Sequence, residues 1–175
     1  MRKTLITGAN RGYGLALMEE CLRRGDRVFA TCRIGKRKAI EQYASEQCTI
    51  IETGIIEEEE IDFLVSSLAR HTDTLDLLIN NAGKLGCDTL ETLSAAELIE
   101  HCKINALSPL LISRACIPLL EKGDNPCIVM SSSTWGSIGY KHDPTNNAPA
   151  SVFGYCGSKA RSEERRVGKE CRSRW

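Results

Sequence analysis

The sequence lacks the features that mark several protein classes. None of its nine cysteines stands in a Cys-x-x-Cys pair, and their odd number and scattered positions argue against a metal site or a disulfide framework. Most of them fall in apolar stretches, which indicates small core residues of a reduced, cytoplasmic protein. The formal net charge is zero, so we expect no nucleic-acid partner.

Long apolar runs are also missing. No run reaches the roughly 20 residues that a membrane-spanning helix needs. Met1-Arg2-Lys3 leads directly into an apolar segment rather than a signal peptide, so we expect no membrane association. At 175 residues the chain is long enough for one domain with a buried core.

The sequence does contain short apolar runs that alternate with helical segments. We expect strands over 4–6, 27–32, 48–52, 75–79 and 126–130. We expect helices over 15–24, 36–46, 57–70 and 94–120 and from Ala150 onward, with a break or kink at Pro109. Strands that are apolar throughout indicate a parallel sheet covered on both faces. The sequence therefore predicts an α/β fold, a doubly wound parallel sheet (Rossmann fold) with strand order 3-2-1-4-5.

The first expected strand runs into a turn with three glycines, Gly8, Gly12 and Gly14, and then into a helix. This arrangement suits a dinucleotide, because a pyrophosphate needs bare backbone and the first N–H groups of a helix. A Cβ at Gly8 or Gly12 would forbid the turn or displace the phosphate, and Gly14 lets the helix press on the strand. An ordinary glycine-rich turn is the alternative, since this fingerprint alone is a weak signal.

Three further signals follow along the chain. Asn80-Asn81-Ala82-Gly83 follows the fourth strand, at the edge where open α/β sheets bind ligands, and Ser131-Ser132-Ser133 follows the fifth. Tyr155 and Lys159 stand four residues apart on one helix face. A nearby ammonium lowers the pKa of a phenol, which suits the phenol to exchange a proton with a carbonyl or alcohol oxygen. Taken singly, turn chemistry, loop serines or a coincidental surface pair would explain each signal.

Together these motifs resemble the short-chain dehydrogenases/reductases. The resemblance covers residues 3–160 and rests on Thr7-Gly8-x-x-x-Gly12-x-Gly14, Asn80-Asn81-Ala82-Gly83, Lys103-Ile104-Asn105, Ser133-x-x-Gly136 and Tyr155-x-x-x-Lys159. It implies an NAD(P)-binding Rossmann domain over 1–160. It also implies an oxidoreductase that interconverts a small-molecule carbonyl and alcohol by hydride transfer, with the hydride chemistry supplied by the cofactor.

The resemblance also implies roles for individual residues. Tyr155 would be the general acid, and Lys159 would lower the pKa of its phenol and hold the nicotinamide ribose. Ser133 would bind the substrate oxygen, with Ser132 as the second choice. Asn105 would hold a water that passes protons towards Lys159, and a hydrogen bond at a helix kink is its alternative role. The implied cofactor-binding residues are Thr7, Gly8, Asn10, Arg11, Gly12, Tyr13, Gly14, Arg33, Asn81, Ala82, Gly83, Tyr155 and Lys159.

The residues after the second strand favour NADP(H) over NAD(H). An acidic residue there would bind the ribose 2′-hydroxyl of NAD. Arg33 instead offers a planar cation suited to a 2′-phosphate, and Arg11 in the glycine turn is placed to help. Two solvated arginines are the alternative. Thr53 departs from the family pattern, in which an aspartate often stands there and contacts the adenine.

Two segments set this chain apart. The segment between Ser133 and Tyr155 is long and resembles that of the C-factor and sniffer-like carbonyl reductases, and we expect His142 within it to be an exposed loop residue rather than a substrate contact. Residues 161–175 carry six basic and three acidic residues with almost no apolar face. They resemble translated vector or adaptor sequence, so we expect an artefactual tail; a genuine basic tail is the alternative.

A chain that departs from the family after residue 160 lacks the family's further strands. We therefore expect residues 127–130 to form an exposed apolar edge strand, and turnover to be weak or absent. Family members pair through two long helices, here 94–120 and the one after Ala150, which implies a homo-oligomer for a full-length protein. The competing interpretations are a non-enzymatic nucleotide-binding or regulatory protein on the same fold and an inert truncated product.

Overall fold

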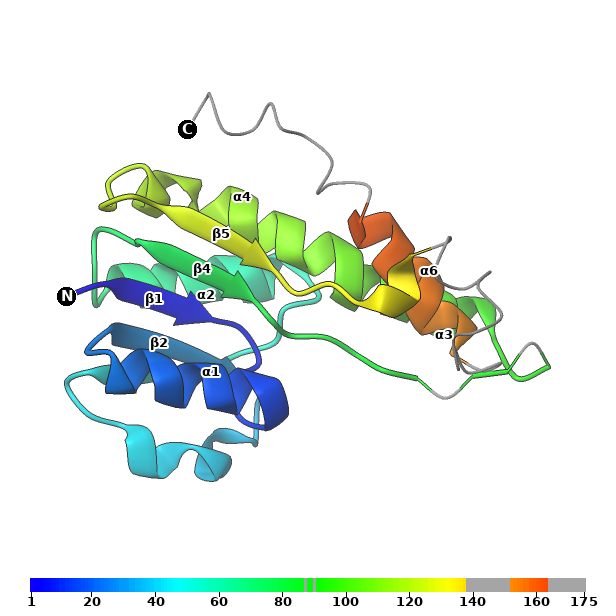
Figure 1. Ribbon diagram of the computed structural model, residues 1–175, viewed down its shortest axis with the longest axis horizontal. Helices are drawn as coiled ribbons and strands as arrows, with labels where there is room; N and C mark the ends of the chain where they lie inside the picture. Colours follow the sequence, from blue (N-terminus) through cyan, green and yellow to red (C-terminus); the bar gives the residue numbers. More distant parts are fainter. Residues whose placement is uncertain (87, 90, 138–151, 164–175) are drawn as a thin grey trace. The chain divides into compact units, whose positions relative to one another are not determined.

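The computed structural model describes residues 1–86, 88–89, 91–137 and 152–163 (Figure 1). Most of the long segment before Tyr155, with His142, and most of the basic tail therefore lie outside the described residues. The chain divides into two compact units, one of Met1–Ala82 with Pro109–Ser131 and one of Gly83–Ser108 with Ser132–Trp175.

The first unit is built on a five-stranded parallel sheet. Its strands are β1 (Lys3–Ile6), β2 (Arg27–Cys32), β3 (Cys48–Glu52), β4 (Leu77–Asn80) and β5 (Cys127–Met130). Their order is β3-β2-β1-β4-β5, and every neighbouring pair is parallel. The predicted fold class and strand order are confirmed.

Helices cover both faces of this sheet, as Figure 1 shows. On one face α1 (Gly12–Arg23) packs Met18 and Cys21 in a cluster with strand residues such as Val28. On the other face α2 (Glu58–Ala69) and α4 (Ser108–Leu120) pack in a cluster with the alternate strand residues, among them Phe29. Because successive strand residues point to opposite faces, strands that are apolar at most positions supply both cores.

The cysteines are largely core residues, as their apolar surroundings predict. Cys21, Cys32, Cys48, Cys116 and Cys156 are buried, whereas Cys102 is half-buried and Cys127 is exposed. Burial raises the pKa of the Cys21 thiol to about 11 and that of Cys116 to about 12, which leaves little reactive thiolate at neutral pH. No group of three or more His, Cys, Asp or Glu side chains within the described residues could hold a metal ion.

The expected helix over 36–46 is wrong. The structure has two single 3₁₀ turns there, η1 (Arg37–Ala39) and η2 (Glu41–Tyr43). Only Ile40 is buried between residues 36 and 46. One buried apolar residue gives no apolar stripe along a helix, and a short helix without such a stripe has nothing to offset its nucleation cost.

The expected helix over 94–120 is interrupted, although not at Pro109 itself. It consists of α3 (Ala95–Cys102), a π-helical turn η3 (Lys103–Leu107) and α4. The backbone N–H of Ser108 donates to the carbonyl of Lys103, five residues back. Pro109 has no N–H and its ring crowds the preceding turn, so the strain appears as a widened turn just before it.

The helical stretch Ala95–Leu120 is long and apolar enough to cross a membrane by length and composition alone, in the part of the chain that the structure describes. Core helices of soluble proteins can be equally long and equally apolar. The second half of this stretch packs against the sheet through Ile112, Cys116 and Leu119, which are at least 92% buried. We therefore interpret the stretch as a core helix.

The last described helix, α6 (Phe153–Glu163), begins three residues after the expected start at Ala150, which lies outside the described residues. Strand β5 is an edge strand in the described chain, since it pairs with β4 alone. Its Cys127 and Val129 are exposed, Val129 by 41%. The exposed apolar edge strand that the sequence predicts is thus present.

Candidate functional site

Hydrogen bonds to Thr7 connect the end of β1 to the residues that follow β4. Its Oγ1 accepts hydrogen bonds from the backbone N–H groups of Asn81 (3.1 Å) and Ala82 (3.0 Å). Thr7 is 1% exposed, so its hydroxyl bonds to backbone groups of the protein rather than to solvent. The sequence places Thr7 among the cofactor-binding residues; in the structure it holds the first turn in place.

Asn81 completes this connection from the other side. Its Nδ2 donates to the carbonyl oxygens of Thr7 (3.0 Å) and Gly8 (3.1 Å). On the β2 side, Thr31 accepts a hydrogen bond from the N–H of Gly8 at its Oγ1 (3.2 Å) and from that of Ala9 at its carbonyl (2.8 Å). The glycine turn, residues 7–14, is therefore held rigidly between two neighbouring strands.

Glycine suits the three positions of the turn for different structural reasons. Gly8 and Gly12 adopt φ angles of +67° and +54°, which L-residues with a side chain rarely adopt. A Cβ on Gly14 would lie 2.2 Å from the Gly8 carbonyl oxygen and 2.4 Å from Asn81 Nδ2, so α1 packs directly on the turn. A Cβ on Gly12 would meet no atom within 4 Å, so the backbone of the turn is open at this position.

The start of α1 carries the properties of an anion site. Arg11 stands at its N-cap without a side-chain hydrogen bond to the helix, and the first turn holds no acidic residue. The positive end of the helix dipole is therefore not neutralised by the helix's own side chains. Arg11, Gly12 and Tyr13 are exposed here, and Asn10 is half-buried.

Arg33 follows β2 and is exposed, as a 2′-phosphate ligand would need to be. Thr53, at the end of β3, is buried and its Oγ1 donates to the carbonyls of Gly54 (3.0 Å) and Glu60 (3.2 Å). Its hydroxyl hydrogen is thus used within the first unit.

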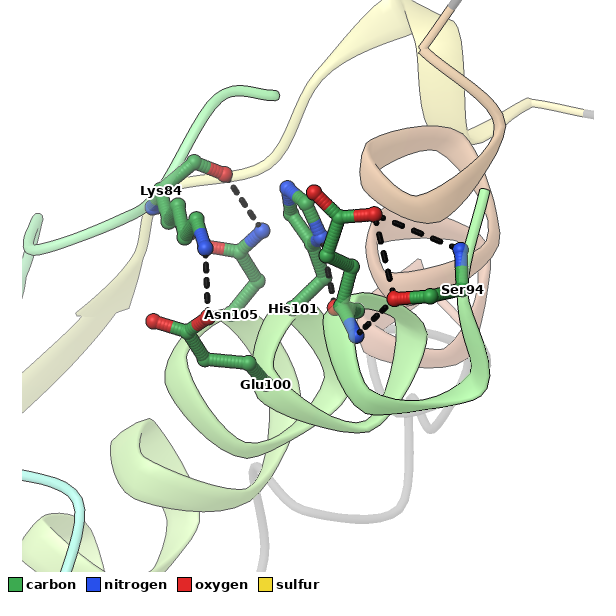
Figure 2. Close-up of polar contacts among 6 residues, drawn as sticks. Lys84, Ser94, Glu100, His101 and Asn105 are labelled. Atoms are coloured by element: carbon green, nitrogen blue, oxygen red, sulfur yellow. Dashed lines mark hydrogen bonds and ion pairs between the residues drawn. The ribbon is translucent and has the colours of Figure 1, made fainter. Parts of the chain in front are cut away.

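The remaining predicted residues belong to the second unit. Asn105 lies in the π-helical turn and is 1% exposed. Its Oδ1 accepts the N–H of Lys84 (2.8 Å), and its Nδ2 donates to the Lys84 carbonyl (2.9 Å) and to Ser158 Oγ (2.9 Å), as Figure 2 shows in part. Both amide hydrogens are used, so Asn105 connects the Lys84 backbone to α6. A water-holding role for Asn105 stays a prediction.

Tyr155 and Lys159 lie on α6, one helical turn apart. The Nζ of Lys159 is 5.8 Å from the centre of the Tyr155 ring. Lys159 is 5% exposed, and burial lowers its pKa below the ordinary value. The half-buried Tyr155 ring also contacts Trp135 edge to face, with ring centres 6.0 Å apart and planes at 89°.

The Ser133-x-x-Gly136 segment forms a 3₁₀ turn, η4 (Thr134–Gly136), capped by Ser133, whose Oγ accepts the N–H of Trp135 (3.2 Å). A Cβ on Gly136 would lie 2.8 Å from the Lys159 carbonyl carbon. The spacing of this motif thus has a structural reason, because glycine lets the turn pack on α6 at Lys159. The exposed Gly83 also falls in this unit, whereas Ala82 belongs to the first.

Sequence reasoning did not single out Trp135, Ser158 or Asp88. Trp135 and Ser158 lie inside the motifs, at the unspecified positions of Ser133-x-x-Gly136 and Tyr155-x-x-x-Lys159. Asp88 bonds to the start of α6 from 66 residues away along the chain. Its signal in the sequence is limited to an acidic residue after Gly86, which no local pattern separates from an ordinary loop.

Replacing Lys159 with methionine is expected to raise the free energy of unfolding at neutral pH. The Lys159 amine binds its proton less tightly in the folded chain than in the unfolded chain, where its pKa is near 10.5. Burying the ammonium therefore costs stability below the lowered pKa, and the cost disappears as the pH rises through that value towards 10.5. Urea unfolding across this range should show a gain for Lys159→Met that shrinks with pH. The exposed Lys122→Met is the control, and a destabilised Lys159→Met protein at neutral pH would contradict the prediction.

Comparisons with known proteins agree with this geometry. The family model for short chain dehydrogenases matches residues 2–160. A short-chain dehydrogenase of Pyricularia oryzae is 31% identical over 181 aligned positions, which cover 98% of this chain and 71% of that protein. The chain spans about half the length of several other curated relatives that it matches.

Solved structures of carbonyl reductases are similar as well. The NADPH-bound carbonyl reductase from chicken fatty liver superposes with a TM-score of 0.83 at 28% identity, covering 94% of this chain and 71% of that one. The putative carbonyl reductase Sniffer of Caenorhabditis elegans gives 0.79 at 28% identity, covering 92% and 75%. These similarities support the sniffer-like branch expected from the sequence. The chain belongs to the short-chain dehydrogenase family.

Proposed function

We propose that the protein is an NADP(H)-dependent oxidoreductase that interconverts a carbonyl and an alcohol, with Tyr155 as the proton donor in reduction. The observation that supports this best is the placement of Tyr155 beside the buried Lys159 on α6. A phenolic hydroxyl, which can donate a proton to a carbonyl oxygen, thus lies on the same helix as a buried amine, with Lys159 Nζ 5.8 Å from the centre of the Tyr155 ring.

The other residues of the second unit have supporting roles in this proposal. Ser133 binds the substrate oxygen through its hydroxyl, and the η4 turn that it caps packs on α6. Lys159 holds the nicotinamide ribose and acts electrostatically on Tyr155. Asn105 fixes the Lys84 backbone and α6 through its three hydrogen bonds and would hold a water for proton transfer towards Lys159.

The first unit fits a dinucleotide. A nicotinamide cofactor supplies or accepts the hydride when bound. The uncapped start of α1 and the open backbone at Gly12 suit the pyrophosphate, since N–H groups and the helix dipole favour an anion there. The exposed guanidinium groups of Arg33 and Arg11 would bind a 2′-phosphate, which favours NADP(H) over NAD(H).

We further propose a cytoplasmic location, a small-molecule carbonyl or alcohol as substrate, and no nucleic-acid or membrane partner. Pairing into a homo-oligomer is proposed for a full-length protein. We expect the 175-residue chain to turn over weakly, because the exposed apolar residues of β5 favour aggregation. The domain boundary at residue 160 and the artefactual origin of the tail remain predictions.

The test is cofactor titration followed by a product assay on the purified chain. NADPH is expected to bind at least about tenfold more tightly than NADH, and Arg33→Ala should remove most of that difference. Incubation with NADPH and a panel of aldehydes and ketones should yield alcohols, measured by mass spectrometry. Cofactor binding without any alcohol would support a non-enzymatic nucleotide-binding protein, and absence of binding would indicate an inert product; either result contradicts the proposal.

A further inference from the structure

The first turn of α6 carries Tyr155, so the position of the phenol depends on how this helix begins. The first N–H groups of a helix have no partner within the helix. Here Asp88 supplies partners from a distant part of the chain. Its Oδ2 accepts the N–H of Gly154 at 2.7 Å, and its main-chain oxygen accepts the N–H of Val152 at 2.6 Å. Asp88 is 5% exposed, so water competes little for these bonds.

The start of α6 needs such support, because its local sequence does not favour it. Val152 has a φ of +75°, a conformation that is costly for a β-branched residue. Gly154, inside the first turn, favours the helix less than almost any other residue. A carboxylate at the N-terminus of the helix is favourable with respect to the helix dipole. Asp88 therefore contributes both two hydrogen bonds and a favourable charge at the point where the backbone is strained.

His101 of α3 packs into the same place. Its ring is 1% exposed, and its Nδ1 lies 2.8 Å from the carbonyl of Glu97, one helical turn back, as Figure 2 shows. A Cβ on Gly154 would lie 2.9 Å from His101 Nδ1. A Cβ on Gly86 would lie 2.6 Å from His101 Nε2 and 3.0 Å from Asp88 Oδ1. The imidazole thus fills the space between the Asp88 segment and α6, and both glycines are needed for this packing.

A further hydrogen bond holds the Tyr155 backbone from the C-terminal side. Ser158 Oγ donates to the carbonyl of Tyr155 at 2.7 Å and accepts from Asn105 Nδ2 at 2.9 Å. The Tyr155 backbone is therefore held on its N-terminal side through Asp88 and on its C-terminal side through Ser158.

We infer that Asp88 is a positioning residue for Tyr155: by bonding to Val152 and Gly154 it fixes the first turn of α6 and so the direction of the phenol. The inference rests on the proposed function of Tyr155. Asp88 acts through α6 rather than on the reacting atoms. A small displacement of a proton donor lowers the rate of the chemical step strongly while binding of the cofactor is preserved.

The test compares Asp88→Ala with Asp88→Asn, which keeps an acceptor oxygen for the Gly154 N–H. Asp88→Ala is expected to lower kcat by about tenfold and to leave KM and NADPH affinity nearly unchanged. Asp88→Asn should retain most of kcat. Circular dichroism checks that each variant is folded, and Asp88→Glu, which displaces the carboxylate by one methylene, replaces Asp88→Ala if that variant does not fold. Equal loss of kcat in the alanine and asparagine variants, or no loss in either, would overturn the inference.

A fluorescence measurement separates this inference from the proposed function. Trp135 packs edge-on against Tyr155, and in a Trp175→Phe background it is the only tryptophan of the chain. Asp88→Ala should make Trp135 more accessible to acrylamide, whereas Asp88→Asn should not. This readout needs no turnover, so it tests the positioning role even if the wild-type chain produces no alcohol. Unchanged quenching in Asp88→Ala would contradict the positioning role.

Discussion

Replacing Tyr155 with phenylalanine is expected to lower the rate of carbonyl reduction by about 10²- to 10⁴-fold, the usual contribution of a positioned proton donor. The substitution removes one oxygen atom. The edge-to-face contact with Trp135 uses the ring, so it should persist in the variant. The affinity for NADPH should stay close to that of the wild type. Product accumulation over long incubations, measured by mass spectrometry, gives the rate, and fluorescence titration gives the affinity.

The matched control is Tyr43→Phe. Tyr43 bonds to Glu19 through its hydroxyl and belongs to the first unit, whereas Tyr155 belongs to the second. The Tyr43→Phe variant should leave the rate of carbonyl reduction unchanged. A loss of rate confined to Tyr155→Phe therefore assigns the effect to the hydroxyl on α6. A Tyr155→Phe variant that still reduces carbonyls at more than about a tenth of the wild-type rate would exclude Tyr155 as the general acid.

The parallel sheet was predictable because each strand is apolar on both faces and each is short. Strands β2 and β3 were placed to the residue from their apolar runs. The register could not be read from the sequence, since it depends on which apolar residues oppose one another across β1, β2 and β4. The helix over 36–46 was wrong for a related reason: its residues have helix-compatible types, but only Ile40 is buried and only Tyr43 packs beside it, too few for an apolar stripe.

The motifs were predictable as a set, but the structure gives the reason that they occur together. Asn81 Nδ2 bonds to the carbonyls of Thr7 and Gly8, so the motif after β4 and the motif after β1 form one hydrogen-bonded unit. In the second unit, Gly136 packs against the backbone at Lys159. Each pair of motifs is thus joined by a contact between residues far apart in the sequence. The same separation along the sequence explains why Asp88 was not predicted: it meets its hydrogen-bond partners, Val152 and Gly154, only in the folded chain.

Gly14→Ala is expected to lower the free energy of unfolding by about 3 kcal/mol and to abolish NADPH binding, as overpacking of a rigid contact does. The new Cβ would lie 2.2 Å from the Gly8 carbonyl oxygen and 2.4 Å from Asn81 Nδ2. Both atoms are fixed, because Asn81 Nδ2 itself bonds to that carbonyl at 3.1 Å. The helix α1 or the glycine turn must therefore move, and either movement disturbs the backbone proposed to bind the pyrophosphate. Urea unfolding and fluorescence titration with NADPH measure the two effects.

Two further variants show whether the clash is the cause. Gly12→Ala meets no atom within 4 Å and carries only the penalty of its φ of +54°, about 1–2 kcal/mol. Asn81→Ala removes the amide that the Gly14 Cβ would meet, but the Gly8 carbonyl stays in place. Combining Asn81→Ala with Gly14→Ala should therefore not restore stability, since the shorter of the two contacts is with backbone. Recovery in the double variant, or wild-type stability in Gly14→Ala alone, would show that α1 does not pack on the turn through Gly14.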